Sequence, residues 1–182
     1  MRRRCTLLLL IALSGVAHAQ DIPAELVKSL DAPGGLIVHI DPGDVARSAT
    51  LPRAEKFLIH LLYTDRDAVR EASAAVAAKD LAGRVTVSVF DGENLPFIDN
   101  MVNAILVSGV KCQVSGAEIA RALAPRGVAV GPASRIPKPA SLIGSGLARY
   151  TKPVPPTIDD WTHNLYDAGN SGISCDLEAG SP

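Results

Sequence analysis

The stretch from Arg84 to Val130 constrains the fold more than any other part of the chain. Residues 85–89 alternate β-branched with small polar side chains, a pattern that predicts a strand. Turn residues follow, and residues 101–107 then form a run that is apolar apart from Asn103 and too short to cross a membrane. An apolar run of this length is typical of a strand buried on both faces. The first half of the stretch therefore predicts two strands of a covered sheet.

A helix and a further strand complete this stretch. Residues 115–123 carry apolar side chains at helical spacing, and Ser115 and Glu118 form the pattern of a capping box. A proline and a glycine end the helix before a strand at 127–131. Apolar runs at 36–40 and 57–62 predict two earlier strands. Strands that alternate with helices over short links predict a doubly wound α/β fold, with a mainly parallel sheet and the first strand near its centre.

Residues 90–103 and 118–128 resemble the later half of class I S-adenosylmethionine-dependent methyltransferases. The resemblance implies a Rossmann-like sheet of the methyltransferase type and makes S-adenosylmethionine the cofactor to consider. In that family an acidic residue after the third strand lies near the adenine, and Asp91 matches this position. None of the matching residues performs chemistry, so the resemblance concerns the fold more than the activity.

The loop after the first predicted strand departs from the family pattern. In the family this loop is rich in glycine, and its bare backbone lies against the methionine part of the cofactor. Here residues 41–45 read Asp-Pro-Gly-Asp-Val, and only Gly43 keeps a family glycine. Pro42 also removes a backbone donor, and His39 stands where an acidic residue is usual. The sequence therefore predicts a poor cradle for the cofactor.

The end of the second predicted strand departs from the pattern as well. The family carries an acidic residue there that accepts both ribose hydroxyls, and the aligned residue is Tyr63. Asp65 follows at the start of a helix predicted near 67–78, which it is expected to cap. The alternative is a shifted loop in which Asp65 reaches the ribose. The candidate cofactor-binding residues are therefore Gly43, Asp65 and Asp91, and S-adenosylmethionine is expected to bind weakly or not at all.

Residues 1–19 have the form of a secretory signal peptide. An arginine run is followed by an apolar core at 7–13 and by Ala17-His18-Ala19, a small-x-small cleavage site. A short membrane anchor is the alternative, but the apolar core falls short of the roughly 20 residues that a span needs. We therefore expect an exported protein, periplasmic or extracellular, with no stable membrane span after cleavage.

The charge balance and the low aromatic content disfavour several classes of partner. Lys and Arg number 18 against 19 Asp and Glu, so nothing indicates binding to nucleic acid or to an anionic membrane. Only 4% of the residues are aromatic, which disfavours a surface that stacks bases or sugars. Cys112 and Cys175 remain after cleavage; an oxidising compartment allows a disulfide, but neither a disulfide framework nor a metal-binding spacing is present. No catalytic constellation stands out, and His39 and His60 are interpreted as structural.

Prolines and glycines dominate residues 132–156, which predicts a linker between a domain at 21–131 and a tail at 157–182. We expect residues 132–182 to make few core contacts apart from those of Trp161 and, after it, Leu165 and Tyr166.

Residues 159–163 and 167–170 resemble the opening segment of pyrroloquinoline-quinone-dehydrogenase-like β-propellers in exported bacterial proteins. In several of those proteins a methyltransferase-like domain precedes the propeller. The resemblance implies a β-propeller domain or an envelope protein as the partner, although no blade repeats precede Pro182. A structural or interaction domain is the function expected. The alternatives are an active methyltransferase and the binding of another nucleotide-like ligand at the same sheet edge.

Overall fold

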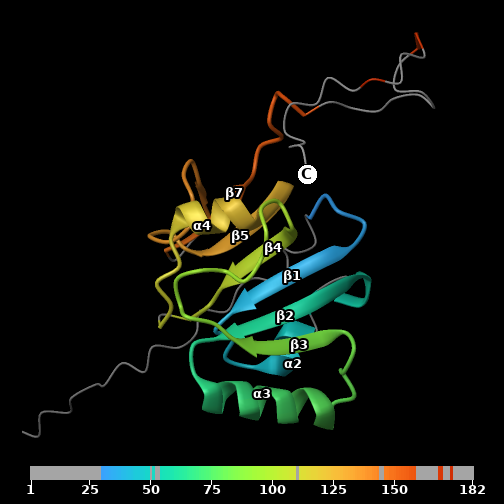
Figure 1. The fold of residues 1–182 in the computed structure, drawn as a ribbon. Coiled ribbons are helices and arrows are strands. Elements are labelled where there is room, and N and C mark those ends of the chain that lie inside the picture. Colours follow the sequence, from blue (N-terminus) through green and yellow to red (C-terminus); the bar gives the residue numbers. More distant parts are fainter. Residues whose placement is uncertain are drawn as a thin grey trace, which may run out of the picture.

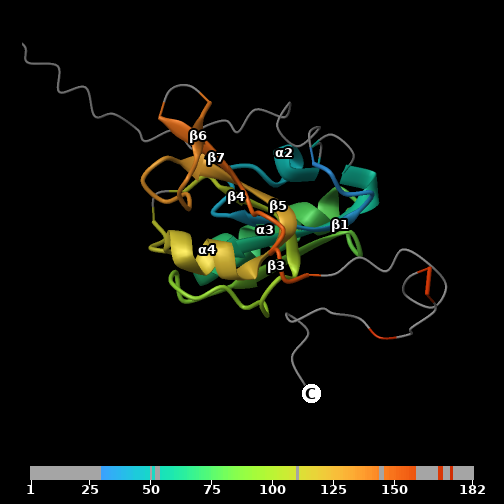
Figure 2. The ribbon, with the colours of Figure 1, turned by 90° about the horizontal axis from the view of Figure 1, so that it is seen from above.

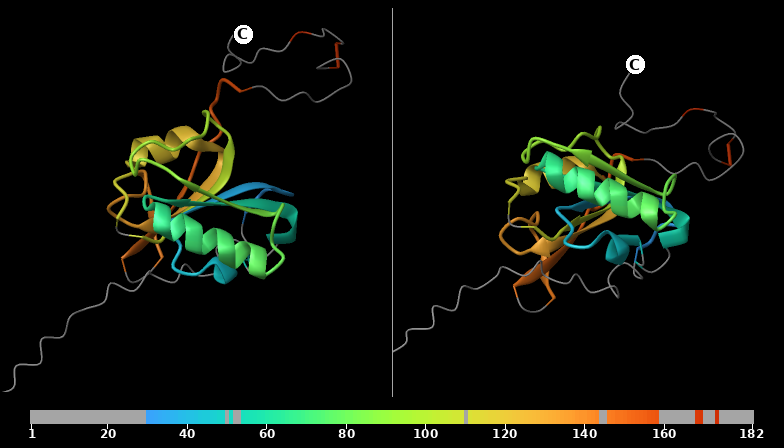
Figure 3. Two further views of the ribbon diagram at one scale, coloured as in Figure 1. Left: turned by 60° about the horizontal axis from the view of Figure 1, so that its bottom comes forward. Right: turned by 90° about the horizontal axis from the view of Figure 1, so that it is seen from below.

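The computed structural model describes residues 30–49, 51, 54–109, 111–143, 146–158, 168–169 and 173. These residues form a seven-stranded sheet with the order β3-β2-β1-β4-β5-β7-β6. Helices lie on both sides of it (Figures 1 and 3). The strands are β1 (Gly35–Ile40), β2 (Phe57–Tyr63), β3 (Val85–Val89), β4 (Val102–Val107), β5 (Leu123–Pro132), β6 (Ser141–Leu142) and β7 (Leu147–Thr151). The helices are α2 (Val45–Ala49), α3 (Arg66–Ala78) and α4 (Gly116–Ala122), with a short 3-10 turn η1 (Ala54–Lys56).

Strands β1 to β5 are parallel, as the sequence predicts, and β1 lies between β2 and β4. The chain therefore reverses its direction of progress across the sheet at β1. The first four strands agree with the predicted positions to within a residue. Strand β5 starts earlier than expected, because α4 ends at Ala122 and Leu123 already pairs with Val102. The proline and glycine that were expected to separate the helix from the strand instead lie in an irregular stretch within β5, where Arg126 adopts a positive φ of 65°.

The two faces of the sheet are covered by different helices. Ala72 and Val76 of α3 and Val45 of α2 belong to a core cluster on one face. Ile119 and Ala122 of α4 belong to the cluster on the other face. Helix α3 is alanine-rich, so it approaches the sheet closely while its remaining residues face solvent. Coverage on both faces explains the continuous apolar runs that identified β1 and β4.

The sheet does not end at Gly131, where the sequence suggested that the domain ends. Residues 132–156, expected to be a linker, contribute β6 and β7, and β7 pairs antiparallel with β5 along its whole length (Figure 2). Ala148 and Tyr150 of β7 are buried in the core, as is Ile136. The expectation that this range makes few core contacts is therefore wrong for the part of it that the structure describes.

Several predictions lie outside the described residues. These are the signal peptide at 1–19, the residues before Leu30 in the domain expected at 21–131, and the tail contacts of Trp161, Leu165 and Tyr166. Leu30 itself is buried in the core cluster that includes α2 and α3. Within the described ranges, none of the helices has the length and apolarity that a membrane crossing requires.

Candidate functional site

The candidate site lies at the edge of the sheet where β1 to β4 end. Backbone hydrogen bonds join these ends: Asp41 N donates to Leu62 O, and Phe90 N donates to Tyr63 O. Because the strands are parallel, the loops that follow them meet at one edge, and open α/β sheets bind ligands there at the point of reversal. Here that point is the crevice between the loops after β1 and β4. The structure thus brings the loops that carry Gly43, Asp65 and Asp91 to a single edge.

The Asp41 side chain lies between the ends of β1 and β4, against Gly109. Asp41 has a positive φ of 51°, and its carboxylate lies so close to Gly109 that a Cβ atom on this glycine would overlap Oδ2. Gly109 therefore has to be a glycine for Asp41 to take this position.

Tyr63 is the last residue of β2, next to the loop that carries Asp41. Its ring is buried, and its hydroxyl donates a 3.2 Å hydrogen bond to the carbonyl oxygen of Pro42. Burial raises the pKa of Tyr63 to about 12, and the negative charges of Asp41 and Asp44 add to this effect. The hydroxyl therefore stays protonated at neutral pH, and its proton is engaged within the protein.

His39 links three elements beneath the crevice. Its Nδ1 lies 2.8 Å from Ser48 Oγ in α2, and its Nε2 lies 2.6 Å from Ser108 Oγ after β4. All three residues are buried, and burial lowers the pKa of His39 to about 4. The neutral imidazole joins β1 to α2 and to the residue after β4 through these two hydroxyls. This agrees with the structural role expected for His39. The sequence did not indicate Ser48 or Ser108 as its partners.

Gly43 lies exposed in the loop before α2. The next residue, Asp44, accepts a 2.8 Å hydrogen bond from Ala46 N with its carboxylate and so caps the first turn of α2. The loop is therefore organised by the flanking acidic residues. Nothing in its geometry assigns a ligand contact to Gly43.

Asp65 caps α3, as expected. Its Oδ1 accepts from Asp67 N at 3.2 Å, and its Oδ2 accepts from Ala68 N at 3.4 Å. The backbone of Asp65 is extended, which is the usual conformation of an N-cap residue. Both carboxylate oxygens are thus directed at the helix rather than at the crevice.

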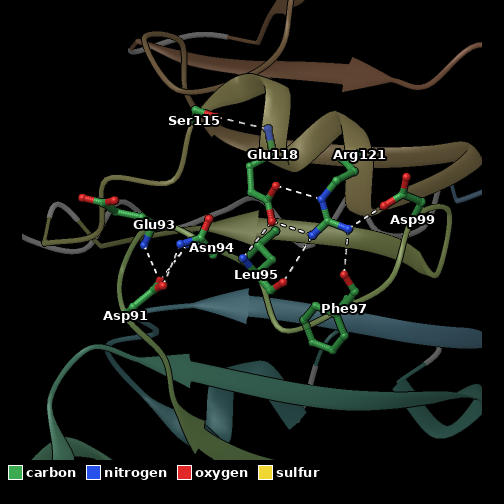
Figure 4. Close-up of polar contacts among 9 residues, drawn as sticks. All are labelled: Asp91, Glu93, Asn94, Leu95, Phe97, Asp99, Ser115, Glu118 and Arg121. Atoms are coloured by element: carbon green, nitrogen blue, oxygen red, sulfur yellow. Dashed lines mark hydrogen bonds and ion pairs between the residues drawn. The ribbon is translucent and has the colours of Figure 1, made fainter.

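Asp91 organises the turn after β3. Its Oδ1 accepts from Glu93 N at 2.8 Å and from Asn94 N at 2.7 Å, while its Oδ2 accepts from Asn94 Nδ2 at 2.7 Å. The Asn94 side chain, followed by the backbone amides, lowers the pKa of Asp91. Asp91 remains exposed, so the carboxylate is both a turn-forming group and open to solvent. Figure 4 shows this turn beside α4.

An ion-pair cluster holds the loop that follows Asp91 against α4 (Figure 4). Arg121 forms a double hydrogen bond with Glu118, at 2.8 and 2.6 Å, and donates to Asp99 at 2.7 Å. It also donates to the carbonyl oxygens of Leu95 and Phe97. Glu118 in turn accepts from Leu95 N at 2.8 Å. The cluster fixes the loop and leaves a hollow of about 400 Å³ between the Asp91 turn and the start of α4.

The sequence indicated only part of this arrangement. Ser115 does cap α4 through its hydroxyl, which accepts from Glu118 N at 3.1 Å. The other half of the capping box has a different role, because the Glu118 carboxylate binds Arg121 and the loop. The spacing of Glu118 and Arg121 on one helix face was the signal that could have indicated the pair.

Cys112 is a free and fully buried thiol. Its sulfur and its carbonyl oxygen both accept hydrogen bonds from Arg135 Nη1. Cys175, the other half of the disulfide considered above, lies outside the described residues. Among the residues that the structure describes, no group of histidine, cysteine and acidic side chains is arranged to hold a metal ion.

No protein-family profile matches the chain, and no curated protein matches it. Solved structures do resemble it, however. A candidate S-adenosyl-L-methionine-dependent methyltransferase from Methanococcus maripaludis superposes with a TM-score of 0.52 at 24% identity, over 59% of this chain and 52% of that one. The chain has the fold of class I S-adenosylmethionine-dependent methyltransferases. This fold is what the mainly parallel sheet with helices on both faces had indicated.

Two further structures agree with this fold. The geranyl diphosphate C-methyltransferase of Streptomyces coelicolor A3(2) gives a TM-score of 0.51 at 17% identity, over 59% of this chain and 43% of that one. The [4+2]-cyclase SpnF gives a TM-score of 0.50 at 22% identity, over 59% of this chain and 42% of that one. This chain therefore spans about half or less of each of these three proteins. One of them is named for a cyclisation, so the methyltransferase fold alone does not fix the reaction.

Proposed function

We propose that this chain is an exported methyltransferase-like domain with a degenerate cofactor site and a structural or interaction role in a propeller-type envelope protein. The observation that carries the proposal is the position of Asp41 against Gly109 in the crevice between β1 and β4. A methionine moiety would need the space at the ends of β1 and β4, and the Asp41 carboxylate lies there against Gly109. This placement supports the proposal that the residues at this edge do not fit the cofactor.

The ribose position supports the same conclusion. A carboxylate there would accept two charge-assisted hydrogen bonds, which are about twice as strong as neutral ones. Tyr63 offers one hydroxyl, and that hydroxyl already donates to Pro42 O. Hydrogen bonds to a charged group contribute roughly 1.5–3 kcal/mol. Since each 1.4 kcal/mol is a factor of ten in affinity, this loss weakens binding by about one to two orders of magnitude.

The role in an envelope protein rests on the sequence. The signal peptide at 1–19 supports export, and export separates the domain from the cytoplasm, where the cofactor is made. The propeller-like segment within 157–182 supports a β-propeller as the partner domain. A Rossmann-like sheet that no longer binds its cofactor still provides a stable surface for such a partner.

The alternative is an active S-adenosylmethionine-dependent methyltransferase. The exposure of Asp91 favours this alternative. Its carboxylate accepts two hydrogen bonds from backbone amides and one from the Asn94 side chain, and a carboxylate can accept about four, so it can still accept one from a ligand. Asp91 also follows β3, where the resemblance places the adenine partner. Asp65 is also exposed, but both of its oxygens accept hydrogen bonds from the first turn of α3.

Crevice-opening variants test the proposal. The double variant Asp41→Gly, Tyr63→Glu removes the carboxylate from the crevice and supplies one at the ribose position. We expect isothermal titration with S-adenosylmethionine to give no binding heat for the unmodified chain and measurable heat for the variant. Asp65→Ala is the matched control, because this carboxylate is engaged at α3. Strong binding by the unmodified chain would support the active enzyme instead.

A further inference from the structure

A second hollow, the amino-edge pocket, lies at the opposite edge of the sheet, where β1, β2 and β4 begin. Its volume of about 470 Å³ is within the range of small-molecule binding sites. Leu58 is 59% exposed and Met101 is 49% exposed. The side chains that form the pocket are mainly those of Leu36, Lys56, Leu58, Arg84, Met101 and Asn103. Apolar and cationic groups thus meet in one hollow that opens to solvent.

The pocket is open because the link between β3 and β4 has no helix. Parallel strands are usually joined by a helix, which then covers the sheet. Residues 90–101 join β3 to β4 as a loop instead. Leu95 and Phe97 of this loop pack in the cluster that contains Leu62, near the end of β2. Leu58, near the start of the same strand, is left uncovered by the residues that the structure describes.

Four neighbouring side chains form a row along the pocket. Leu36 of β1 pairs in register with Leu58 of β2. When the register is continued to the outer strands, Arg84 lies beside Leu58, just before β3, and Asn103 lies beside Leu36, on β4. The row therefore runs from a cation over two leucines to an amide. It crosses three strand spacings, which is roughly 14 Å.

The amide of Asn103 has a fixed orientation. Its Oδ1 accepts a 2.9 Å hydrogen bond from Leu36 N. Gly35 makes room for this contact, because a Cβ atom at this position would overlap Oδ1. The amide nitrogen is the group that remains, and the structure shows no partner for it among the described residues. This end of the row therefore offers a hydrogen-bond donor.

The other end of the row offers a cationic donor. Arg84 Nε is buried, and it has no hydrogen-bond partner in the part of the chain that the structure describes. Lys56 adds a second positive charge to the lining, against the single carboxylate of Glu55. A buried donor without a partner is costly, and a bound acceptor removes this cost. Both ends of the row thus favour acceptors, and the leucines between them favour an apolar chain.

We propose that the amino-edge pocket binds an elongated small molecule with a carboxylate at one end, an apolar chain in the middle and a hydrogen-bond acceptor at the other end. The carboxylate accepts from Arg84, and the apolar chain lies over Leu58 and Leu36. The far acceptor receives a hydrogen bond from Asn103 Nδ2. This site does not depend on the state of the cofactor crevice, because that crevice lies at the other edge of the sheet.

Isothermal titration of the full chain with sebacate, a linear dicarboxylate, tests the proposal. We expect sebacate to bind. Decanoate, which has a chain of the same length but no second acceptor, should bind several-fold more weakly. Leu58→Asp places a negative charge under the apolar chain and should abolish the binding of both. Leu142→Asp is the matched control, because Leu142 is 75% exposed on β6, at the far end of the sheet, and this variant should leave both affinities unchanged.

Two further variants separate the two ends of the row. Asn103→Asp keeps an oxygen for Leu36 N but replaces the donor with a carboxylate oxygen, so sebacate should bind about tenfold more weakly. Decanoate should be affected little, because its carboxylate at Arg84 lies beyond a Debye length from this position. Arg84→Gln should weaken the binding of both ligands.

Circular dichroism has to show that each variant keeps its sheet. If Asn103→Asp does not fold, the ratio of the sebacate and decanoate affinities in the unmodified chain decides the far contact. Absence of sebacate binding to the unmodified chain at millimolar concentration would overturn the proposal. So would binding that survives Leu58→Asp, or binding that Leu142→Asp weakens equally. A dimer in sedimentation that Leu58→Asp dissociates would assign this face to a second copy of the chain and would also overturn it.

Discussion

The hydroxyl of Tyr63, at the end of β2, donates its proton to the carbonyl oxygen of Pro42 in the loop after β1. This bond joins the end of β2 to the loop after β1, and it engages the hydroxyl that, in the proposed function, replaces the family's ribose-binding carboxylate. Burial keeps the pKa of Tyr63 at about 12, so the bond persists across the physiological pH range. The proposed function holds that S-adenosylmethionine at this edge would have to break this bond and displace Asp41.

Removal of the α3 cap should destabilise the protein. Asp65→Ala leaves two backbone amides of the first turn without a partner, and N-cap losses of this kind cost about 1 kcal/mol. Asp65→Ser should keep most of the stability. Asp67→Ala is the control, since Asp67 pairs with Arg70 on an exposed surface. Urea unfolding measures all three, and an unchanged midpoint for Asp65→Ala would exclude the capping role.

Replacement of Arg121 should release the loop at 93–99. Its guanidinium binds two carboxylates and two carbonyl oxygens from a side chain that is one-third exposed, so we expect Arg121→Ala to cost about 1–2 kcal/mol. Arg121→Lys should lose nearly as much stability, because an ammonium group cannot reproduce the two parallel hydrogen bonds that the guanidinium donates to Glu118. Limited proteolysis should cut the loop faster in both variants. Arg70→Ala should change stability by less than about 0.5 kcal/mol; a loss equal to that of Arg121→Ala would contradict the cluster's role.

The stability should fall as the pH drops below the ordinary pKa of histidine. His39 has a pKa of about 4 in the folded protein, below the ordinary histidine value of 6.5. The unfolded chain therefore binds more protons between these two values, and the stabilisation that is present above them is lost as the pH falls. Between about pH 7 and pH 5 the expected loss is about 2 kcal/mol. Urea unfolding at both pH values measures it.

His39→Gln should be less stable than the unmodified chain near neutral pH and should show a flatter pH profile. His60→Gln is the control, because His60 is only partly buried, although burial lowers its pKa as well. This variant should keep most of the slope. A pH profile of His39→Gln as steep as that of the unmodified chain would mean that other groups produce the acid sensitivity.

The chain should not fold when it ends at Gly131. Such a chain lacks β7, so β5 loses the hydrogen bonds of one edge and the core loses Ala148 and Tyr150. A chain that ends at Ile158 keeps both strands and the contacts of Lys152, and it should fold. Circular dichroism and urea unfolding distinguish the two. Cooperative unfolding of the shorter chain would show that β7 is dispensable.

The strands that the sequence predicted are those whose signal is local. The runs at 36–40, 57–62 and 102–107 are apolar except for one residue each (His39, His60 and Asn103), because most of their side chains are buried, so composition alone indicates them. Strand β7 reads Leu-Ala-Arg-Tyr-Thr amid prolines and glycines, and it forms because β5 offers an open edge. The pairing that makes this strand is not local, and no window of sequence shows it.

In the candidate site, too, local contacts could be predicted from the sequence and long-range contacts could not. The capping role of Asp65 was predictable, because the partners of a cap lie two and three residues further along the chain. The contact of Asp41 with Gly109 joins residues that are distant in sequence, and it became visible only once β1 and β4 were neighbours. The sequence did show that the loop after the first strand departs from the family. It could not show that a carboxylate fills the crevice.

Calorimetric titration of the full, unmodified chain with S-adenosylmethionine tests the central claim most directly. The account predicts no binding in the micromolar range, because Asp41 occupies the crevice and the Tyr63 hydroxyl is bonded to Pro42. Micromolar binding that is lost in Asp91→Ala would contradict it, and would identify the chain as a cofactor-binding methyltransferase domain.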